Sequence, residues 1–485
     1  MALGVSQQVL LIPVFLHFWT SDVLAAWLAI YAAGSLVLIA DGGLQIRAIN
    51  RFLAFKASVD CDGRTGQFYA SMIRVYFSLV TMLAALLLIA AWLLPPSRVL
   101  GFTATAHFDA AFVVITVGTL MVLPSNLTSA LYRTRGSYAR AIWLQSAAMF
   151  FAQLMQLLAV IATGSLLAVA VAYASVQVLT AIYIVAFDGP RLFPHLRGRR
   201  VSPSLRWCFG QIRLGLPFGF AGAADMALLN APVLLVSVFV SGRVAVVQWA
   251  LTRVIAGLVR MLCLQATLPL SAELGHDHAI GARDRLRDLY ARGSVFVTLL
   301  ASLTVSALLP FWPDFLALWT HGTIPYDPLL TITLLLGSSA AAPSILALGY
   351  ANCSNQGDLL VRTKVIQLAL FVVLSVLLIP PMGPLGAAIA IVASDLLVQS
   401  GFMASVIISR TLRHPSRHVA FLAAIWLTVV GGGWAVGAII GWLVPGTGAI
   451  HLVAGCALWL IIIGLLVSPL AIKRVRNGLI AAVPR

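Results

Sequence analysis

Two apolar segments, 212–240 and 244–270, carry charged side chains at positions where a membrane-spanning helix normally has none. Asp225 lies in the first segment, and Arg253 and Arg260 lie in the second. A charge near the centre of a bilayer costs at least about 2.5 kcal/mol and is usually kept only inside a helix bundle or a wet cavity. Because Arg253 and Arg260 are seven residues apart, a helix places them on one face, about 10 Å apart in height.

Guanidinium groups in this position could bind phosphate, because they present a planar fork of hydrogen-bond donors. We interpret Arg253 and Arg260 as the lining of an aqueous cavity that suits phosphate groups. The alternative is a structural ion pair between Asp225 and Arg260, with Arg253 reaching outward to the membrane surface. The cavity is favoured because one aspartate does not neutralise two arginines.

Three further charged residues lie in or beside apolar segments. Asp395 is midway along segment 384–409 with no partner beside it in the sequence, so we group it with Asp225 as a cavity acid or ion-coupling residue for H⁺ or Na⁺. A carboxyl hydrogen-bonded to a neighbouring helix is the alternative for Asp395. Asp41 and Arg74 fall near the cytoplasmic surface, where we expect either a solvated pair at the cytoplasmic mouth or a gate contact.

Polar amides are also spread over the apolar segments. Such side chains most often hydrogen-bond one spanning helix to another, and the alternative is that some of them line a path for sugars. Seven glutamines are of this kind: Gln145, Gln153, Gln156, Gln177, Gln265, Gln367 and Gln399.

The composition is that of an integral membrane protein. Hydrophobic residues make up 61% and charged residues 9% of the 485 residues, and the formal net charge is +16. The basic residues form short clusters between apolar runs, which argues against nucleic acid as a partner. The five cysteines are scattered, and no phosphate-binding G-x-x-x-x-G-K-[ST] loop is present, so the sequence predicts no metal or nucleotide cofactor.

Fourteen apolar runs are long enough to cross a bilayer, which predicts an all-α membrane protein. The first residues lack the basic region of a cleavable signal peptide, so we expect the first run to be retained. The runs are 1–18, 23–43, 68–94, 109–131, 140–162, 165–187, 212–240, 244–270, 288–312, 328–350, 361–380, 384–409, 418–443 and 449–471.

The basic residues fix the expected orientation. With the N-terminus in the cytoplasm, 26 of the 31 Lys and Arg residues fall in inner connections, Lys364 among them, and the outer connections hold only Arg98 and Arg243. This asymmetry follows the positive-inside rule, so we expect a multi-pass protein of the bacterial cytoplasmic (inner) membrane with both termini in the cytoplasm.

An internal repeat with an offset of about 221 residues predicts two matching halves. It pairs Trp27 with Trp249, and Gln145 and Gln177 with Gln367 and Gln399. Six spans per half give parallel repeats, whose substrate sites lie between the halves near the bilayer midplane. The expected domains are an N-terminal six-helix bundle (1–187), a cytoplasmic linker (188–211), a C-terminal six-helix bundle (212–410), and two additional helices with a cytoplasmic tail (411–485).

Four segments resemble the bacterial polysaccharide (O-antigen type) flippases, a family within the multidrug/oligosaccharidyl-lipid/polysaccharide exporter superfamily. The resemblance implies two six-helix bundles plus two helices around a central cavity, and export of an undecaprenyl-diphosphate-linked oligosaccharide. It also implies that cavity cations meet the diphosphate, a role that transfers here to Arg253 and Arg260. The segments are Ala40-Asp41-Gly42-Gly43-Leu44, Tyr132-Arg133-Thr134-Arg135-Gly136, Arg213-Leu214-Gly215-Leu216-Pro217 and Leu268-Pro269-Leu270-Ser271-Ala272-Glu273-Leu274.

The sequence therefore predicts a secondary transporter that moves this lipid-linked glycan to the outer leaflet by alternating access. Membrane lipids, a polysaccharide polymerase and chain-length proteins are the expected partners. An ion-coupled multidrug exporter or a peptidoglycan lipid-precursor flippase of the same superfamily is the alternative. A membrane-embedded polysaccharide polymerase is the alternative of another class; its active site would need a sizeable outer loop rich in acids or arginines, and the longest outer connection, 310–328, contains no arginine.

Overall fold

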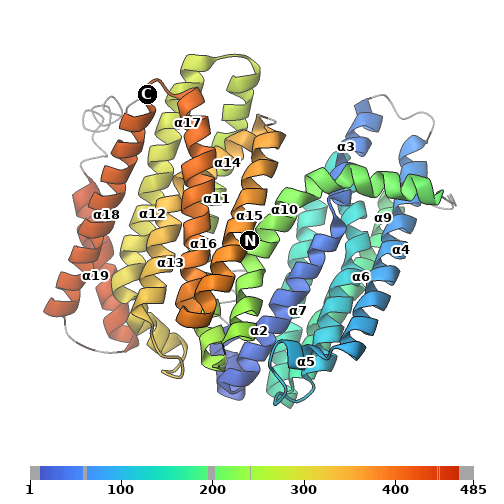
Figure 1. Cartoon of the computed structure of the whole chain (residues 1–485), viewed down its shortest axis with the longest axis horizontal. Coiled ribbons are helices and arrows are strands. Elements are labelled where there is room, and N and C mark those ends of the chain that lie inside the picture. The colour runs from blue at the N-terminus through green and yellow to red at the C-terminus, as the bar shows by residue number, and fades with distance from the viewer. Residues whose placement is uncertain are drawn as a thin grey trace. The chain divides into compact units, whose positions relative to one another are not determined.

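The structure is a computed structural model, and it describes residues 11–57, 63–194, 203–240, 242–354, 356–444, 446 and 448–468. Within these ranges the chain is helical and contains no strand (Figure 1). Among the described residues, twelve helices are long and apolar enough to cross a membrane, and the bent pair Pro328–Ala341 and Pro343–Cys353, taken as one span, makes a thirteenth. Residues 11–18 of the expected first span are helical, and its other residues lie outside the described ranges. The predicted fold class is confirmed.

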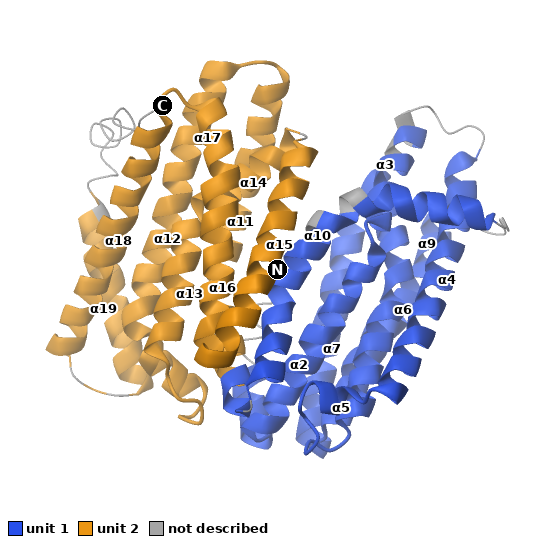
Figure 2. Cartoon of the chain, in the orientation of Figure 1, with its two compact units in different colours: residues 1–246 blue, residues 247–485 orange. Residues whose placement is uncertain are grey.

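By its internal contacts the chain divides into two compact units, Met1–Val246 and Val247–Arg485, shown in two colours in Figure 2. In unit 1, α6 packs against α2, α4 and α8, and α10 packs against α2 and α3. The elements of unit 1 are α2 (Ser21–Val37), η1 (Leu38–Asp41), α3 (Leu44–Ala57), α4 (Arg64–Leu93), α5 (Pro96–Val99), α6 (Phe108–Thr134), α7 (Tyr138–Thr163), α8 (Leu166–Ile182), η2 (Tyr183–Asp188), α9 (Gly189–Leu192) and α10 (Leu205–Phe239).

Unit 2 contains the remaining spans, and α11 begins just before its boundary. In this unit α15 packs along α16, and α12 packs along α18, one of the two helices expected outside the repeat. Its elements are α11 (Arg243–Ala279), α12 (Arg283–Trp319), α13 (Pro328–Ala341), α14 (Pro343–Cys353), α15 (Gly357–Met382), α16 (Pro384–Ser394), η4 (Asp395–Ala404), α17 (Ser405–Thr411), α18 (Pro415–Leu443) and α19 (Ala449–Val467).

Two connections hold more structure than the apolar runs indicate. Helix α3 fills the arginine-bearing connection after the second span. In the expected linker, Asp188 is buried and accepts hydrogen bonds from Tyr132 (2.6 Å) and from Arg140 Nε (2.9 Å). The division at 188–211 stays a prediction, because residues 195–202 lie outside the described ranges, as does the tail after residue 468.

Glycines bring two distant segments of unit 1 into backbone contact. Gly43 adopts a left-handed conformation (φ 77°), which glycine tolerates without steric cost. A Cβ added at Gly43 would overlap backbone atoms of Gly215 and Gly219, and a Cβ at Gly219 would overlap Gly42 and Gly43. Two of the segments that carried the family resemblance, 40–44 and 213–217, therefore pack together where α10 crosses the turn between α2 and α3.

Candidate functional site

Helix α11 carries the two arginines that the sequence singled out. Arg253 and Arg260 are both half-buried, and their guanidinium charges interact with each other. Nη1 of Arg260 lies 3.4 Å from Oδ2 of Asp395. Among the described residues, no carboxylate forms an ion pair with Arg253 and no hydrogen bond from its guanidinium group is found. Within unit 2 the acid paired with Arg260 is thus Asp395, and the alternative of an Asp225–Arg260 pair stays a prediction.

Asp395 has partners that its sequence neighbours do not reveal. Besides Arg260, Nε2 of Gln367 donates a hydrogen bond of 2.5 Å to its Oδ1 atom. Asp395 opens η4, a ten-residue π-helical stretch within the span Pro384–Thr411. Such widened turns are rare and occur frequently at functional sites. Asp395 has no charged partner beside it in the sequence, as expected, but α11 and α15 supply partners from distant parts of the chain.

Lys364 extends this polar cluster further into the helix packing. The positive-inside pattern assigned Lys364 to a cytoplasmic connection, but it lies on α15 and is 1% exposed. Its Nζ atom donates to the side-chain oxygens of Gln367 (3.0 Å) and Gln399 (3.2 Å). Gln399 in turn donates to Ser344 Oγ at 2.9 Å. Two glutamines expected either to join helices or to line a sugar path therefore hold a buried lysine.

A signal for Lys364 was present in the sequence. Lys364 and Gln367 are three residues apart, and residues at that spacing share a helix face. A lysine that shares a helix face with a glutamine is as consistent with a buried hydrogen bond as with a position in a loop. The missing information was where α15 begins, at Gly357, about one turn before the apolar run 361–380.

Unit 1 contains a cavity of about 530 Å³ inside its helix bundle. The cavity is lined by α2, α6, α7 and α8 together with the short η1 and η2 segments, and no charged side chain lines it. Gln145 and Gln177 contribute amides. Tyr31 and Tyr173, whose rings meet edge to face with centroids 5.9 Å apart, contribute hydroxyls. Other polar lining residues are Ser35, Thr119, Ser125, Asn126, Ser146 and Thr180.

The cavity of unit 1 and the polar cluster of unit 2 occupy matching positions in the repeat. Each cluster residue has a cavity-lining residue 222 positions before it in the chain. At equivalent positions of the repeat, unit 1 thus has an uncharged cavity lining and unit 2 has a charged cluster. The pairs are Tyr31 and Arg253, Leu38 and Arg260, Val122 and Ser344, Ile142 and Lys364, Gln145 and Gln367, Tyr173 and Asp395, and Gln177 and Gln399.

The residues expected at the cytoplasmic mouth are both in unit 1. Oδ1 of Asp41 accepts a hydrogen bond from the Tyr76 hydroxyl at 2.7 Å, and Oδ2 accepts from the Gln45 backbone at 3.2 Å. Arg74 is half-buried on α4. Asp41 is therefore held by Tyr76 of α4 and by the first turn of α3. Asp225 is half-buried on α10.

Comparison with known proteins places the fold. No family model matches the sequence, and no curated protein matches it. A solved structure of the lipid II flippase MurJ in an inward closed conformation superposes with a TM-score of 0.73 at 11% identity, covering 97% of each chain.

Two multidrug transporters are also similar. An inward-facing multidrug resistance MATE transporter of the MOP superfamily gives a TM-score of 0.66 at 15% identity, covering 87% of this chain and 96% of its own. The MATE transporter VcmN of Vibrio cholerae gives 0.56 at 14% identity, covering 82% and 91%. These structures are of transporters, and the chain has the fold that they share.

Proposed function

We propose that the protein is a flippase that moves an undecaprenyl-diphosphate-linked oligosaccharide from the inner to the outer leaflet of the bacterial cytoplasmic membrane. It would act by alternating access and supply a polysaccharide polymerase and its chain-length proteins, with both termini in the cytoplasm. The fold shared with a lipid II flippase and with MATE exporters supports a transporter of this class.

The observation that carries the proposal is the charge of the cluster on α11, α15 and η4. Arg260 pairs with Asp395, and among the described residues Arg253 on the same helix has no carboxylate partner. The buried Lys364 adds a third cation to the cluster. A cation without a carboxylate partner inside a spanning bundle is costly, and it is kept where it serves a substrate or ion path. A diphosphate supplies the missing negative charge, and arginine binds it through paired hydrogen bonds. A multidrug exporter for cations would gain nothing from this excess.

The cavity of unit 1 supports the glycan part of the proposed substrate. Sugar hydroxyls are both donors and acceptors, and so are the amides of Gln145 and Gln177 and the hydroxyls of Tyr31 and Tyr173. No lining charge competes for them. We assign the neutral positions to the oligosaccharide and the charged positions to its diphosphate.

Coupling to an ion gradient is assigned to Asp395, with Asp225 as the second candidate acid. Release of Asp395 from Arg260 would let the carboxylate take up H⁺ or Na⁺, while the diphosphate replaces it as the partner of the arginine. The two events would then exclude each other, which is the differential interaction that a coupled transporter needs. Asp41 and Arg74 remain our candidates for the cytoplasmic mouth.

The proposal is tested in a strain that depends on this protein for its surface polysaccharide. Arg253→Ala and Arg260→Ala, each with the protein present in the membrane at the wild-type level, are expected to abolish the polysaccharide. Arg362→Ala, an exposed arginine on α15 outside the cluster, is the matched control and is expected to leave it unchanged. Normal polymer from both cluster variants would end the assignment.

A lipid II flippase is the second candidate, favoured by the similarity to MurJ over nearly the whole of both chains. The chain would then sustain growth of a strain depleted of its own lipid II flippase. Failure to sustain growth would argue against this role. A viable deletion strain that loses its surface glycan and keeps its drug sensitivity would support the glycan flippase instead.

A further inference from the structure

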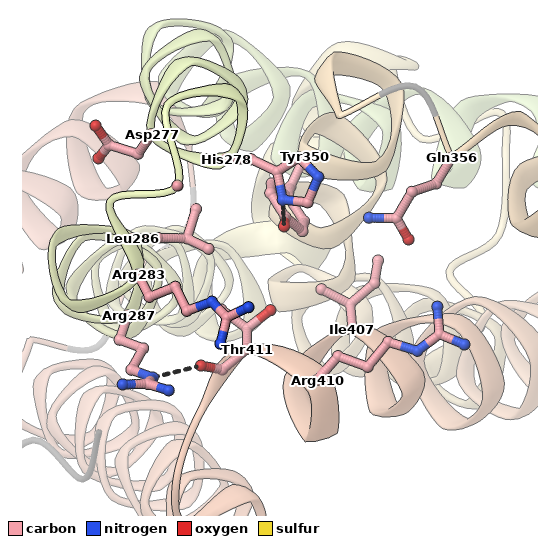
Figure 3. Close-up of a pocket in the computed structure, with 11 residues that line it drawn as sticks. Asp277, His278, Arg283, Leu286, Arg287, Tyr350, Gln356, Ile407, Arg410 and Thr411 are labelled. Atoms are coloured by element: carbon pink, nitrogen blue, oxygen red, sulfur yellow. Dashed lines mark hydrogen bonds between the residues drawn. The ribbon is translucent and has the colours of Figure 1, made fainter.

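Unit 2 contains a second polar feature, a pocket of about 550 Å³ at the end where α11 meets α12 and α17 ends (Figure 3). The positive-inside pattern predicts that this end faces the cytoplasm. The pocket shares no residue with the cluster of Arg253, Arg260 and Asp395. It is lined by Asp277, His278, Gly281, Arg283, Leu286, Arg287, Tyr350, Gln356, Ile407, Arg410 and Thr411.

The acidic residue of this pocket is already engaged. Asp277 is buried and lies 3.4 Å from Arg285 Nε; its oxygens accept no hydrogen bond from a described residue, and its carboxylate points away from the middle of the pocket (Figure 3). Arg287 is also engaged, because it bonds to Asp284 at 2.9 Å and donates from Nε to the Thr411 carbonyl at 3.2 Å. Neither group therefore offers a free charge to a ligand.

Arg283 and Arg410 are different. Within the part of the chain that the structure describes, neither side chain forms a hydrogen bond or an ion pair, and both are exposed. Arg283 extends from α12 toward the middle of the pocket, and Arg410 lies across from it on α17 (Figure 3). Two guanidinium groups that line the same pocket and are unpaired among the described residues suit a phosphate group.

Gln356 adds a requirement for a hydroxyl group on the ligand. Oε1 of Gln356 is buried and has no hydrogen-bond partner among the described residues. A phosphate oxygen without a proton does not donate to Oε1, but a hydroxyl next to the phosphate does. Tyr350, whose hydroxyl lies 2.9 Å from His278 Nδ1, and Ile407 close the rest of the pocket.

We propose that this pocket binds a phosphate ester that carries a free hydroxyl, with Arg283 and Arg410 on the phosphate and Gln356 on the hydroxyl. The ligand is the headgroup of an anionic membrane lipid or a soluble polyol phosphate. The volume of the pocket lies within the usual range for small-ligand sites, roughly 300–1,000 Å³.

The test uses the full-length protein in phosphatidylcholine nanodiscs. Glycerol 3-phosphate is titrated by calorimetry, and nanodiscs with and without phosphatidylglycerol are compared by native mass spectrometry for retained lipid. The double variant R283Q/R410Q is expected to weaken binding at least about tenfold, as loss of charge-assisted hydrogen bonds requires. The matched control R362Q/R417Q removes two exposed arginines outside the pocket and is expected to bind within about twofold of wild type.

Binding of glycerol 3-phosphate identifies a soluble ligand, and retention of phosphatidylglycerol alone identifies a lipid headgroup; either outcome supports the site. Gln356→Leu is expected to erase the preference for glycerol 3-phosphate over inorganic phosphate. If R283Q/R410Q does not fold, Gln356→Glu replaces it, because a carboxylate there repels the phosphate while both arginines remain. Equal weakening in the two double variants, or no binding of either probe to wild type, would overturn the proposal.

Discussion

Nη1 of Arg260 lies 3.4 Å from Oδ2 of Asp395, although 135 residues separate the two along the chain. The pair joins α11 to the first residue of η4, and the two side chains remain 35% and 16% exposed. A partly exposed ion pair contributes little to folding, about 0–1 kcal/mol. Stability therefore does not explain why both charges are kept in spanning segments, and we propose that they are kept for transport.

Asp395→Asn tests whether this carboxylate couples transport to an ion gradient. The amide still accepts the hydrogen bond from Gln367, so the helices stay joined, but it no longer neutralises Arg260. Gradient-driven flipping is expected to fall about tenfold, within the usual range for coupling between two binding events. The measurement is the flipping of a fluorescent undecaprenyl-diphosphate oligosaccharide in proteoliposomes, with and without a pH or sodium gradient.

Asp358→Asn is the control for the Asp395 substitution, because Asp358 is exposed in the first turn of α15, outside the cluster. It makes the same chemical change and is expected to leave the gradient response unaltered. An Asp395→Asn protein that still responds fully to the gradient would assign the coupling elsewhere, with Asp225 as the next residue to change.

The helices could be predicted from the sequence because spanning length and apolar content are properties of a single segment. The expected run 109–131 corresponds to Phe108–Thr134, and 418–443 to Pro415–Leu443. Helix α3 was missed because it is amphipathic and too short to span. Its fourteen residues read as a charged connection.

The candidate site could be predicted only in part, because it depends on contacts between distant segments. Arg253 and Arg260 are conspicuous as charges in an apolar run, and the structure keeps both half-buried on α11. The partner of Arg260 could not be chosen between Asp225 and Asp395 without knowing which helices are neighbours. Lys364 was assigned to a cytoplasmic connection by the positive-inside rule, although it is buried on α15.

Lys364→Met tests whether the buried lysine stabilises unit 2. The substitution removes the donor that satisfies Gln367 and Gln399, and each buried group left without a partner costs about 1–3 kcal/mol. The detergent-solubilised variant is expected to melt at a lower temperature than wild type. Arg362→Met changes an exposed cation on the same helix and should leave the melting midpoint in place. A Lys364→Met protein that melts at or above the wild-type temperature would mean that the lysine serves transport alone.

Asp188→Asn tests the anchor of η2 in unit 1. The Asp188 carboxylate is fully buried and binds Arg140 and Tyr132, so the change leaves a guanidinium group without its charge partner. Removing one partner of a buried pair costs up to about 3–5 kcal/mol, and we expect about 2–3 because Arg140 is 45% exposed. Tyr132→Phe deletes one hydrogen bond of the same cluster and is expected to cost about 1 kcal/mol. Thermal melting that ranks the two variants in the opposite order would contradict this account.

Gly219→Ala tests the contact between the turn after α2 and helix α10. A methyl group at Gly219 would overlap backbone atoms of Gly42 and Gly43, which do not rotate away as a flexible side chain would. Overpacking of this kind costs about 1–3 kcal/mol or more, so the variant is expected to melt well below wild type and to reach the membrane at a reduced level. Gly222→Ala, one turn further along the same helix, adds the same methyl group in open space and is expected to be neutral or slightly stabilising, by up to about 1 kcal/mol. Equal melting temperatures for Gly219→Ala and Gly222→Ala would show that the fold does not require the close approach of α10 to Gly42 and Gly43. The resemblance of the two glycine segments to the flippase family would then need another explanation.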